Sequence, residues 1–180
     1  MRLGGGSQKG SAFERKVCRQ LSHWLSGGKR EDLFWRSAMS GGRATLGLKK
    51  GMVRATQAGD VTAIDGKGLG AQFLKQFVVE CKHVKSLDLD KAVAKQTGAF
   101  VKYWAKHLGE ARAHSRSPFL VARQNRFPTL LFLDMDGAEH FALLDFTHNP
   151  VLGVLKSPSL VTAIYVIDFE WFLENWHSNV

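Results

Sequence analysis

The chain has 180 residues, a length typical of one domain, and 44% of them are hydrophobic, which is enough for a buried core. No apolar run reaches the roughly 18 residues that span a membrane, and the start of the chain lacks the apolar segment of a secretory signal. Cys18 and Cys81 show no zinc-ligand spacing, so we expect reduced thiols and a cytoplasmic protein.

Positive charge is concentrated at the start of the chain. The formal net charge is +9, and residues 1–58, with twelve Lys or Arg and three acids, carry all of the excess. The remaining residues hold 13 basic and 13 acidic side chains. Because Lys and Arg contacts to phosphate supply most of non-specific nucleic-acid affinity, this local excess favours a polyanionic partner over a surface that only solubilises the protein.

The first part of the chain predicts a helix, a strand and a loop. A flexible tail is expected at residues 1–10. From Ser11 to Trp24 apolar side chains recur every three or four positions, which predicts a helix, and the Ser-Gly-Gly that follows should end it. Residues 32–38 are short and aromatic, as in a strand. Residues 39–58, rich in glycine and basic side chains without a period, are expected to form a mobile basic loop.

The rest of the chain predicts a mixed sheet with helices on its faces. One apolar helix face is expected from Val93, Thr97, Phe100, Trp104 and Leu108, with Asp88 or Asp90 as the cap. The expected segments are strands at 60–64 and 77–82 with a glycine-rich connection at 66–71, a helix at 90–108, strands at 118–124, 128–134, 141–146 and 161–168, and a closing helix at 169–176. All of residues 1–180 are expected to form one domain, with 136–180 as an elaboration.

An acid and a base interrupt the apolar strand at 77–82. Side chains alternate along a strand, so Glu80 and Lys82 share one face while their apolar neighbours share the other. Asp60 begins the strand before, and the two carboxylates converge if these strands pair as a hairpin. Paired carboxylates bind a hard cation such as Mg²⁺, which activates water and stabilises charge on phosphate. Because Lys82 could contact that water or phosphate, the pattern predicts a phosphodiester hydrolysis site.

The same residues carry a resemblance to a known family. Asp60 followed by Glu80-Cys81-Lys82 resembles the PD-(D/E)xK nuclease signature, although Ala58-Gly59 stands where the signature has its proline. KGSAFERKVCRQL at 9–21 and RSAMSGG at 36–42 are similar to the opening of archaeal-type Holliday-junction resolvases, and PFLVARQNRFPTLLFL at 118–133 resembles a strand pair of phage resolvase-like nucleases. The resemblance covers about residues 9–135.

The resemblance implies a fold, a function and partners. The implied fold is α/β, a restriction-endonuclease-like core in which a mixed central sheet is flanked by helices in α-β-β-β-α-β order. The implied activity is a metal-dependent, structure-selective DNA endonuclease of recombination and repair, a bacterial or phage-encoded homodimer that nicks four-way junctions symmetrically. Its cofactor would be Mg²⁺, for which Mn²⁺ would substitute.

The resemblance also implies roles for individual residues. Asp60 and Glu80 would ligate the metal, helped by the main-chain carbonyl of Cys81, and Glu14 would complete the acidic cluster. Lys82 would position or activate the attacking water. Two further residues are assigned, Ser40 on a loop near the scissile phosphate and Gln96 as a contact to a metal-bound water or phosphate. The basic residues expected to contact DNA are Lys9, Arg15, Arg36, Arg43, Lys49, Lys50 and Arg54.

Other interpretations stay open at this point. Glu80 and Lys82 could form a solvent-facing ion pair, which stabilises little, and Glu14 could be an ordinary polar position. The aromatic residues of 169–176 could form a dimer surface or pack on the chain's own core. The alternative functions are a restriction- or repair-type nuclease on other DNA and a non-catalytic DNA-binding module. No phosphate-loop pattern is present, so no nucleotide cofactor is expected.

Overall fold

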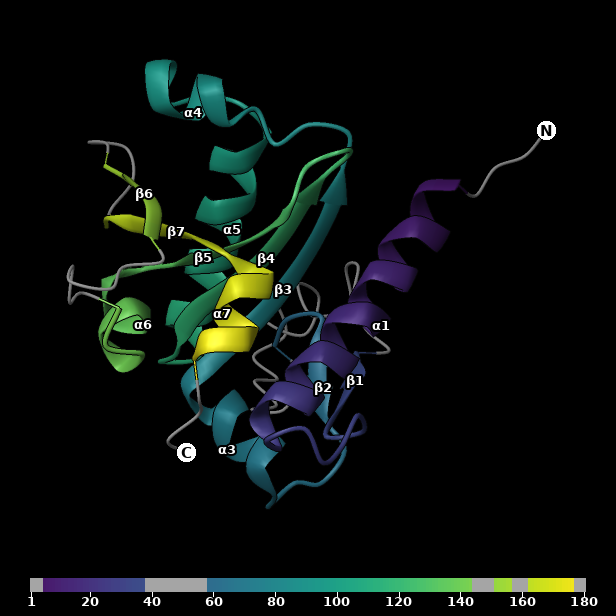
Figure 1. The fold of residues 1–180 in the computed structure, drawn as a ribbon. Helices are drawn as coiled ribbons and strands as arrows, with labels where there is room; N and C mark the ends of the chain where they lie inside the picture. The colour runs from purple at the N-terminus through teal and green to yellow at the C-terminus, as the bar shows by residue number, and fades with distance from the viewer. Residues whose placement is uncertain (1–4, 38–57, 144–150, 157–161, 177–180) are drawn as a thin grey trace.

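The computed structural model describes residues 5–37, 58–143, 151–156 and 162–176 (Figure 1). The predicted basic loop, apart from Ala58, lies outside these residues. The same holds for five expected site residues, which are Ser40, Arg43, Lys49, Lys50 and Arg54.

A five-stranded mixed sheet forms the centre of the fold. The strand order is β3-β4-β5-β7-β6; β3 and β4 are parallel, and the other neighbours are antiparallel. The strands are β3 (Phe77–Val84), β4 (Ser117–Gln124), β5 (Thr129–Leu133), β6 (Val151–Leu155) and β7 (Ile164–Asp168). A separate antiparallel pair consists of β1 (Phe34–Arg36) and β2 (Val61–Ala63).

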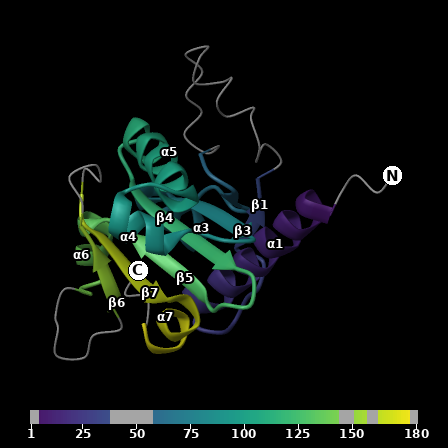
Figure 2. The same cartoon turned by 90° about the horizontal axis from the view of Figure 1, so that it is seen from above.

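Helices cover both faces of this sheet, as predicted. α1 (Gly5–Leu25), α3 (Leu69–Gln76), α6 (Met135–His140) and α7 (Phe169–Asn175) lie on one face, and α4 (Leu89–Lys95) and α5 (Ala99–Ala113) lie on the other. Figure 2 shows α5 and α7 on opposite sides of the strands. The two faces follow from strand alternation: Phe119 and Val121 of β4 join the first core, and Leu120 and Ala122 join the second. The mixed sheet flanked by helices is therefore confirmed.

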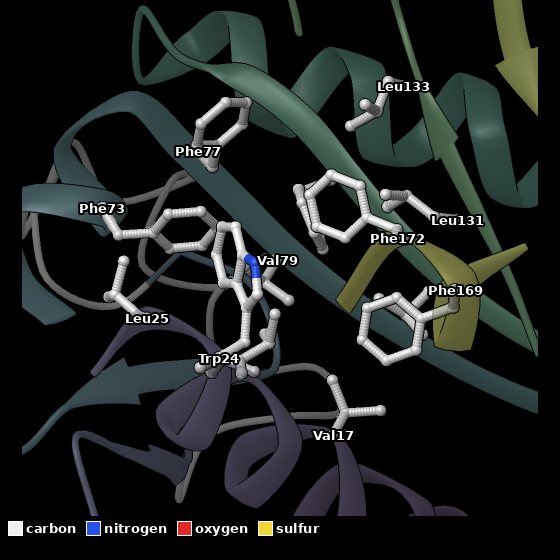
Figure 3. Close-up of a cluster of buried hydrophobic side chains, with 14 of the residues drawn as sticks. Val17, Trp24, Leu25, Phe73, Phe77, Val79, Leu131, Leu133, Phe169 and Phe172 are labelled. Carbon is white, nitrogen blue, oxygen red and sulfur yellow. The ribbon is translucent and has the colours of Figure 1, made fainter. Parts of the chain in front are cut away.

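Aromatic side chains from distant segments fill the larger core (Figure 3). The Trp24 ring of α1 lies 5.9 Å from the Phe73 ring of α3 and 5.2 Å from the Phe172 ring of α7. Phe73 in turn lies 5.0 Å from Phe77 of β3. These contacts bury large apolar areas and hold α1, α3 and α7 against the strand that carries Glu80.

Two segments in the first half of the chain are helical where the sequence predicted a flexible tail or a loop. α1 begins at Gly5, so residues 5–10, expected as a flexible tail, are helical. The glycine-rich connection at 66–71 instead leads into α3, which begins at Leu69. Gly70 explains the error, because a Cβ there would lie 2.9 Å from the carbonyl oxygen of Leu33. That glycine allows close packing of α3 on β1 and does not mark a loop.

The prediction of a single helix at 90–108 is also wrong. Two helices, α4 and α5, occupy the region, and the chain turns between them with positive φ at Gln96 (55°) and Gly98 (105°). Val93 is 67% exposed, so the expected apolar face does not extend into α4. Asp88 is the N-cap residue of α4, but its side chain makes no capping hydrogen bond there and instead accepts from the amide of Ala99, the first residue of α5, 3.3 Å away.

The C-terminal part completes the sheet. Phe141 to Leu143 form a turn after α6 in place of the start of the strand expected at 141–146, and residues 144–146 lie outside the described part. β7, within the expected strand at 161–168, lies between β5 and β6, and α7 confirms the closing helix. β6 was not predicted. No helix in the described ranges is long and apolar enough to cross a membrane.

Candidate active site

Asp60 lies at the free edge of β3, the first strand in the sheet order. Its amide donates to the carbonyl of Val79 (2.8 Å), and its Oδ2 accepts from the amide of Cys81 (2.9 Å). The expected hairpin between the two motif strands is wrong, because β2 pairs with β1 in a separate sheet. The Asp60 carboxylate nevertheless bonds to β3, because it accepts from a β3 amide at the edge where a neighbouring strand would pair.

The backbone before Asp60 is held from two sides. Gly59 has φ +77°, and a Cβ there would overlap the carbonyl oxygen of Val79. Proline cannot adopt this angle, because its ring fixes φ near −65°. The Gly59 amide, which a proline would lack, donates to Oε1 of Glu110 on α5 (3.1 Å). Gly59 and Glu110 therefore provide a different way of placing the aspartate from the proline of the usual motif.

Glu80 and Lys82 share one face of β3, as strand alternation predicted. Lys82 Nζ donates to Oε1 of Glu80 and lies 3.8 Å from Oδ2 of Asp60, so one ammonium stands between two carboxylates. Glu80 is only 8% exposed, so the alternative of a solvent-facing ion pair is wrong. Phe77, Val79 and Cys81 join the core on the opposite face.

Burial and mutual repulsion set the charge of this group. Burial raises the pKa of Asp60 to about 7, and the charge of Glu80 adds to the rise, while Lys82 and the Cys81 amide oppose it. For Lys82, burial lowers the pKa, but Glu80 and Asp60 outweigh this effect and the net pKa is raised. Lys82 therefore stays an ammonium ion, and it only partly compensates the two carboxylates.

Glu14 and Arg36 form a second charged pair beside the first. Arg36 Nε donates to Oε2 of Glu14 across 2.9 Å, which links β1 to α1. Glu14 is also the weakest of the causes that raise the pKa of Asp60. Arg36, one of the residues expected to contact DNA, forms an ion pair with Glu14, and both side chains are partly buried. Glu14 lies near the acidic pair while being bound to an arginine.

The donor set fits a hard divalent cation. Oδ1 of Asp60 and Oε2 of Glu80 accept no hydrogen bond within the described part of the chain, which leaves one oxygen of each carboxylate available. The Cys81 amide points to the Asp60 edge, and its carbonyl points the same way, because both groups of a strand residue share one side. Among the described residues no cluster of three His, Cys, Asp or Glu side chains forms a ready metal site. Mg²⁺ needs only one or two carboxylates and keeps several waters.

The other expected residues lie apart from this group. Gln96 ends α4 as its C-cap, and within the described ranges no hydrogen bond joins its side chain to the carboxylates. Arg15 is exposed on α1. Lys9 donates to Oδ1 of Asn125, in the turn after β4. The Cys81 thiol is buried in the core, as predicted, and burial raises its pKa well above the usual range.

Two residues of α5 near the site were missed from the sequence. Glu110 holds the Gly59 amide, and His107 lies one turn earlier. Burial, followed by the charge of Lys82, lowers the pKa of His107 to about 3, so its imidazole is neutral. The sequence carries a signal for His107 alone, a polar residue at a position of the buried helix face that is otherwise apolar.

Residues 5–176 match the family described as "Phage putative PDDEXK endonuclease". No curated protein and no solved structure matches the chain. Nucleases of this superfamily act on DNA and generally use divalent metals, and the mixed sheet flanked by helices agrees with their restriction-endonuclease-like fold. Because the match spans nearly the whole chain, the protein belongs to this family of phage PD-(D/E)xK endonucleases.

Proposed function

We propose that the chain is a Mg²⁺-dependent, structure-selective DNA endonuclease that resolves four-way junctions as a symmetric dimer. The observation that carries the proposal is the placement of the Asp60 and Glu80 carboxylates around the Lys82 ammonium at a sheet edge. The basic character of residues 1–58 and the resemblance of residues 9–21 to resolvases support branched DNA as the substrate.

Each residue of the site has its own part in hydrolysis. Asp60 and Glu80 would hold the metal through their available oxygens, with the Cys81 carbonyl as a further ligand. A bound divalent metal supplies a water of lowered pKa and stabilises charge on the phosphate. Lys82, which stays protonated beside two carboxylates, would position the attacking water or contact the phosphate instead of accepting a proton. Glu110 would keep Asp60 in place through Gly59.

Lys82→Ala is expected to slow the single-turnover cleavage rate by roughly 10²- to 10³-fold, with little change in DNA affinity, because the ammonium acts on charge that develops during reaction. Lys82→Arg should not restore the rate, since a planar guanidinium does not replace a compact ammonium between two carboxylates. Quench-flow cleavage at saturating enzyme measures the rate. An unchanged rate in Lys82→Ala would assign the lysine to structure alone.

A junction resolvase needs two matched cuts, and each chain has one Asp60–Glu80–Lys82 group. A four-way junction has approximate twofold symmetry, which an isologous dimer matches. The C-terminal helix does not supply the dimer surface through its phenylalanines, because Phe169 and Phe172 are fully buried in the chain's own core.

The substrate and the dimer are tested together. Light scattering should give about twice the 20.0 kDa mass of the chain. With Mg²⁺ or Mn²⁺, a mobile cruciform should be cut into two nicked duplexes well before a linear duplex of the same sequence, and EDTA should stop both reactions. A monomer that cuts linear and branched DNA alike would be a nuclease of another substrate class. A protein that binds DNA and cuts neither would contradict the catalytic assignment.

A further inference from the structure

Three basic side chains gather at the carboxyl ends of β3 and β4. These two strand ends lie at the top of the sheet in Figure 1. His83 of β3 and Arg123 of β4 are register partners. Lys9 of α1 reaches the same place, because its ammonium donates to Oδ1 of Asn125 in the turn after β4. The Phe13 ring lies 5.4 Å from the His83 ring and supports it from α1. The three side chains therefore come from three separate elements and meet at one point.

These basic side chains have no acidic partner in the described part of the chain. None of them takes part in an ion pair there. The cluster consists of these three side chains and Asn125, which accepts from the Lys9 ammonium. All four side chains are partly buried. Like charges held together with reduced access to water are destabilising unless an anion joins them.

Two other partly buried cations near the candidate active site differ from the cluster, because each has a carboxylate partner. Lys82 lies between two carboxylates, and Arg36 is paired with Glu14. Lys9 is held by a neutral amide, which fixes the position of the ammonium without neutralising it. The fold thus keeps a positive charge in place at the ends of β3 and β4 and leaves it uncompensated within the described residues.

The cluster is next to the candidate active site along the chain. His83 directly follows Lys82, and strand alternation puts the two side chains on opposite faces of the edge strand β3. A DNA strand that brings a phosphate to Lys82 would continue past the end of β3. A second backbone phosphate would then come within reach of the cluster on the α1 side.

We propose that Lys9, His83 and Arg123, with Asn125 as the fixing residue, form a second phosphate site that binds a backbone phosphodiester of the DNA being cut. The proposal rests on the proposed function, because it takes the substrate of that site to be DNA. Its chemistry is that of non-specific DNA contacts, in which Lys and Arg neutralise phosphate and release counterions. The cluster would fix the position of the DNA strand while Asp60 and Glu80 serve the hydrolysis.

The test is the salt dependence of DNA affinity, measured by fluorescence anisotropy of a labelled four-way junction in EDTA, where no cleavage occurs. The double variant Lys9→Ala/Arg123→Ala should bind roughly fivefold to tenfold more weakly at ~0.1 M salt. The slope of log affinity against log salt concentration should become less steep by about 0.9, because one DNA phosphate is no longer neutralised. Asn125→Asp, which adds a carboxylate to the cluster, should weaken binding in the same direction. Circular dichroism and thermal melting establish that each variant is folded.

The matched control is Lys67→Ala/Lys75→Ala, which also removes two positive charges. Both lysines are exposed, and Lys75 lies on α3, which leads into the amino end of β3. An eight-residue strand, about 26 Å long, therefore separates Lys75 from the cluster. The control should leave the slope unchanged. If the cluster variant shows the slope of the control, or both variants weaken binding equally, the cluster is an ordinary solubilising surface and the proposal fails.

Failure of this proposal is distinguishable from failure of the proposed function. A wild-type protein that binds junctions with the expected salt slope and cuts nothing would contradict the nuclease site and leave the phosphate site standing. A protein that cuts while the cluster variant keeps its slope would overturn the phosphate site alone. A wild-type protein that binds no DNA overturns both.

Discussion

Asp60→Asn and Glu80→Gln are each expected to slow DNA cleavage by about a thousandfold, because a catalytic metal contributes several kcal/mol and each ~1.4 kcal/mol is a factor of ten in rate. Both substitutions keep the side-chain size and remove one anionic ligand. Single-turnover cleavage of a labelled junction in Mg²⁺ measures the effect. Calorimetric titration with Mn²⁺ in the absence of DNA should show a weaker metal site.

DNA binding in these two variants should be retained or become tighter without metal, since one fewer carboxylate repels phosphate. Asp65→Asn is the matched control. It makes the same chemical change five residues later, at an exposed turn where Asp65 accepts from the Lys67 amide. Cleavage by the control should match that of wild type. Wild-type rates in both Asp60→Asn and Glu80→Gln would mean that hydrolysis, if present, occurs elsewhere.

Gly59→Ala is expected to destabilise the fold by about 2–4 kcal/mol, a fall in Tm of roughly 5–12 °C, because it combines a positive φ with a clash against backbone. The clashing atom is the Val79 carbonyl oxygen, which also accepts from Asp60. Cleavage should therefore fall along with stability. Gly59→Pro, which restores the proline of the motif, should be at least as harmful, since proline can neither adopt this φ nor donate to Glu110.

Two controls separate the steric effect from the loss of the hydrogen bond. Gly109→Ala, on α5 with no atom within 4 Å of the added Cβ, should be neutral or stabilising by up to about 1 kcal/mol. Glu110→Ala should weaken Mn²⁺ binding and cleavage with a smaller loss of Tm than Gly59→Ala, and Glu110→Gln, which keeps an acceptor oxygen, should recover part of both. If Gly59→Ala melts and cuts like wild type, the backbone at residue 59 does not constrain Asp60.

The shared face of Glu80 and Lys82 could be predicted from the sequence because its geometry is local. Glu80 and Lys82 are two residues apart, so any strand puts them on one face, whereas Asp60 directly precedes β2, an earlier strand. The pairing of that strand could not be predicted, since β2 pairs with β1, and the hydrogen bonds to β3 come from the amide and carboxylate of Asp60. Glu110 was missed for the same reason: a hydrogen bond across 51 positions leaves no period or spacing in the sequence.

Glycine predicted the end of α1 correctly but gave wrong boundaries at two other places. Gly70 is inside a helix because a neighbouring backbone leaves no room for a side chain, whereas Gly98 ends the link between α4 and α5 with a positive φ. The same residue type therefore predicted a loop where a helix forms, and it was overlooked where a helix is interrupted. Apolar periodicity identified α1, β3, β4, β5 and α7, since their buried faces repeat within each element.

The bond between Glu110 and Gly59 also bears on when, during synthesis, the protein becomes able to cut DNA. A nascent chain that has been made as far as α4 already contains Asp60, Glu80 and Lys82. It lacks α5, which fixes the backbone before Asp60, and β4, which pairs with β3 along all eight residues. Until these later segments are translated and folded, the three residues belong to an incomplete sheet. On the proposed assignment of these residues, the order of the chain would delay nuclease activity until α5 and β4 have been translated and folded.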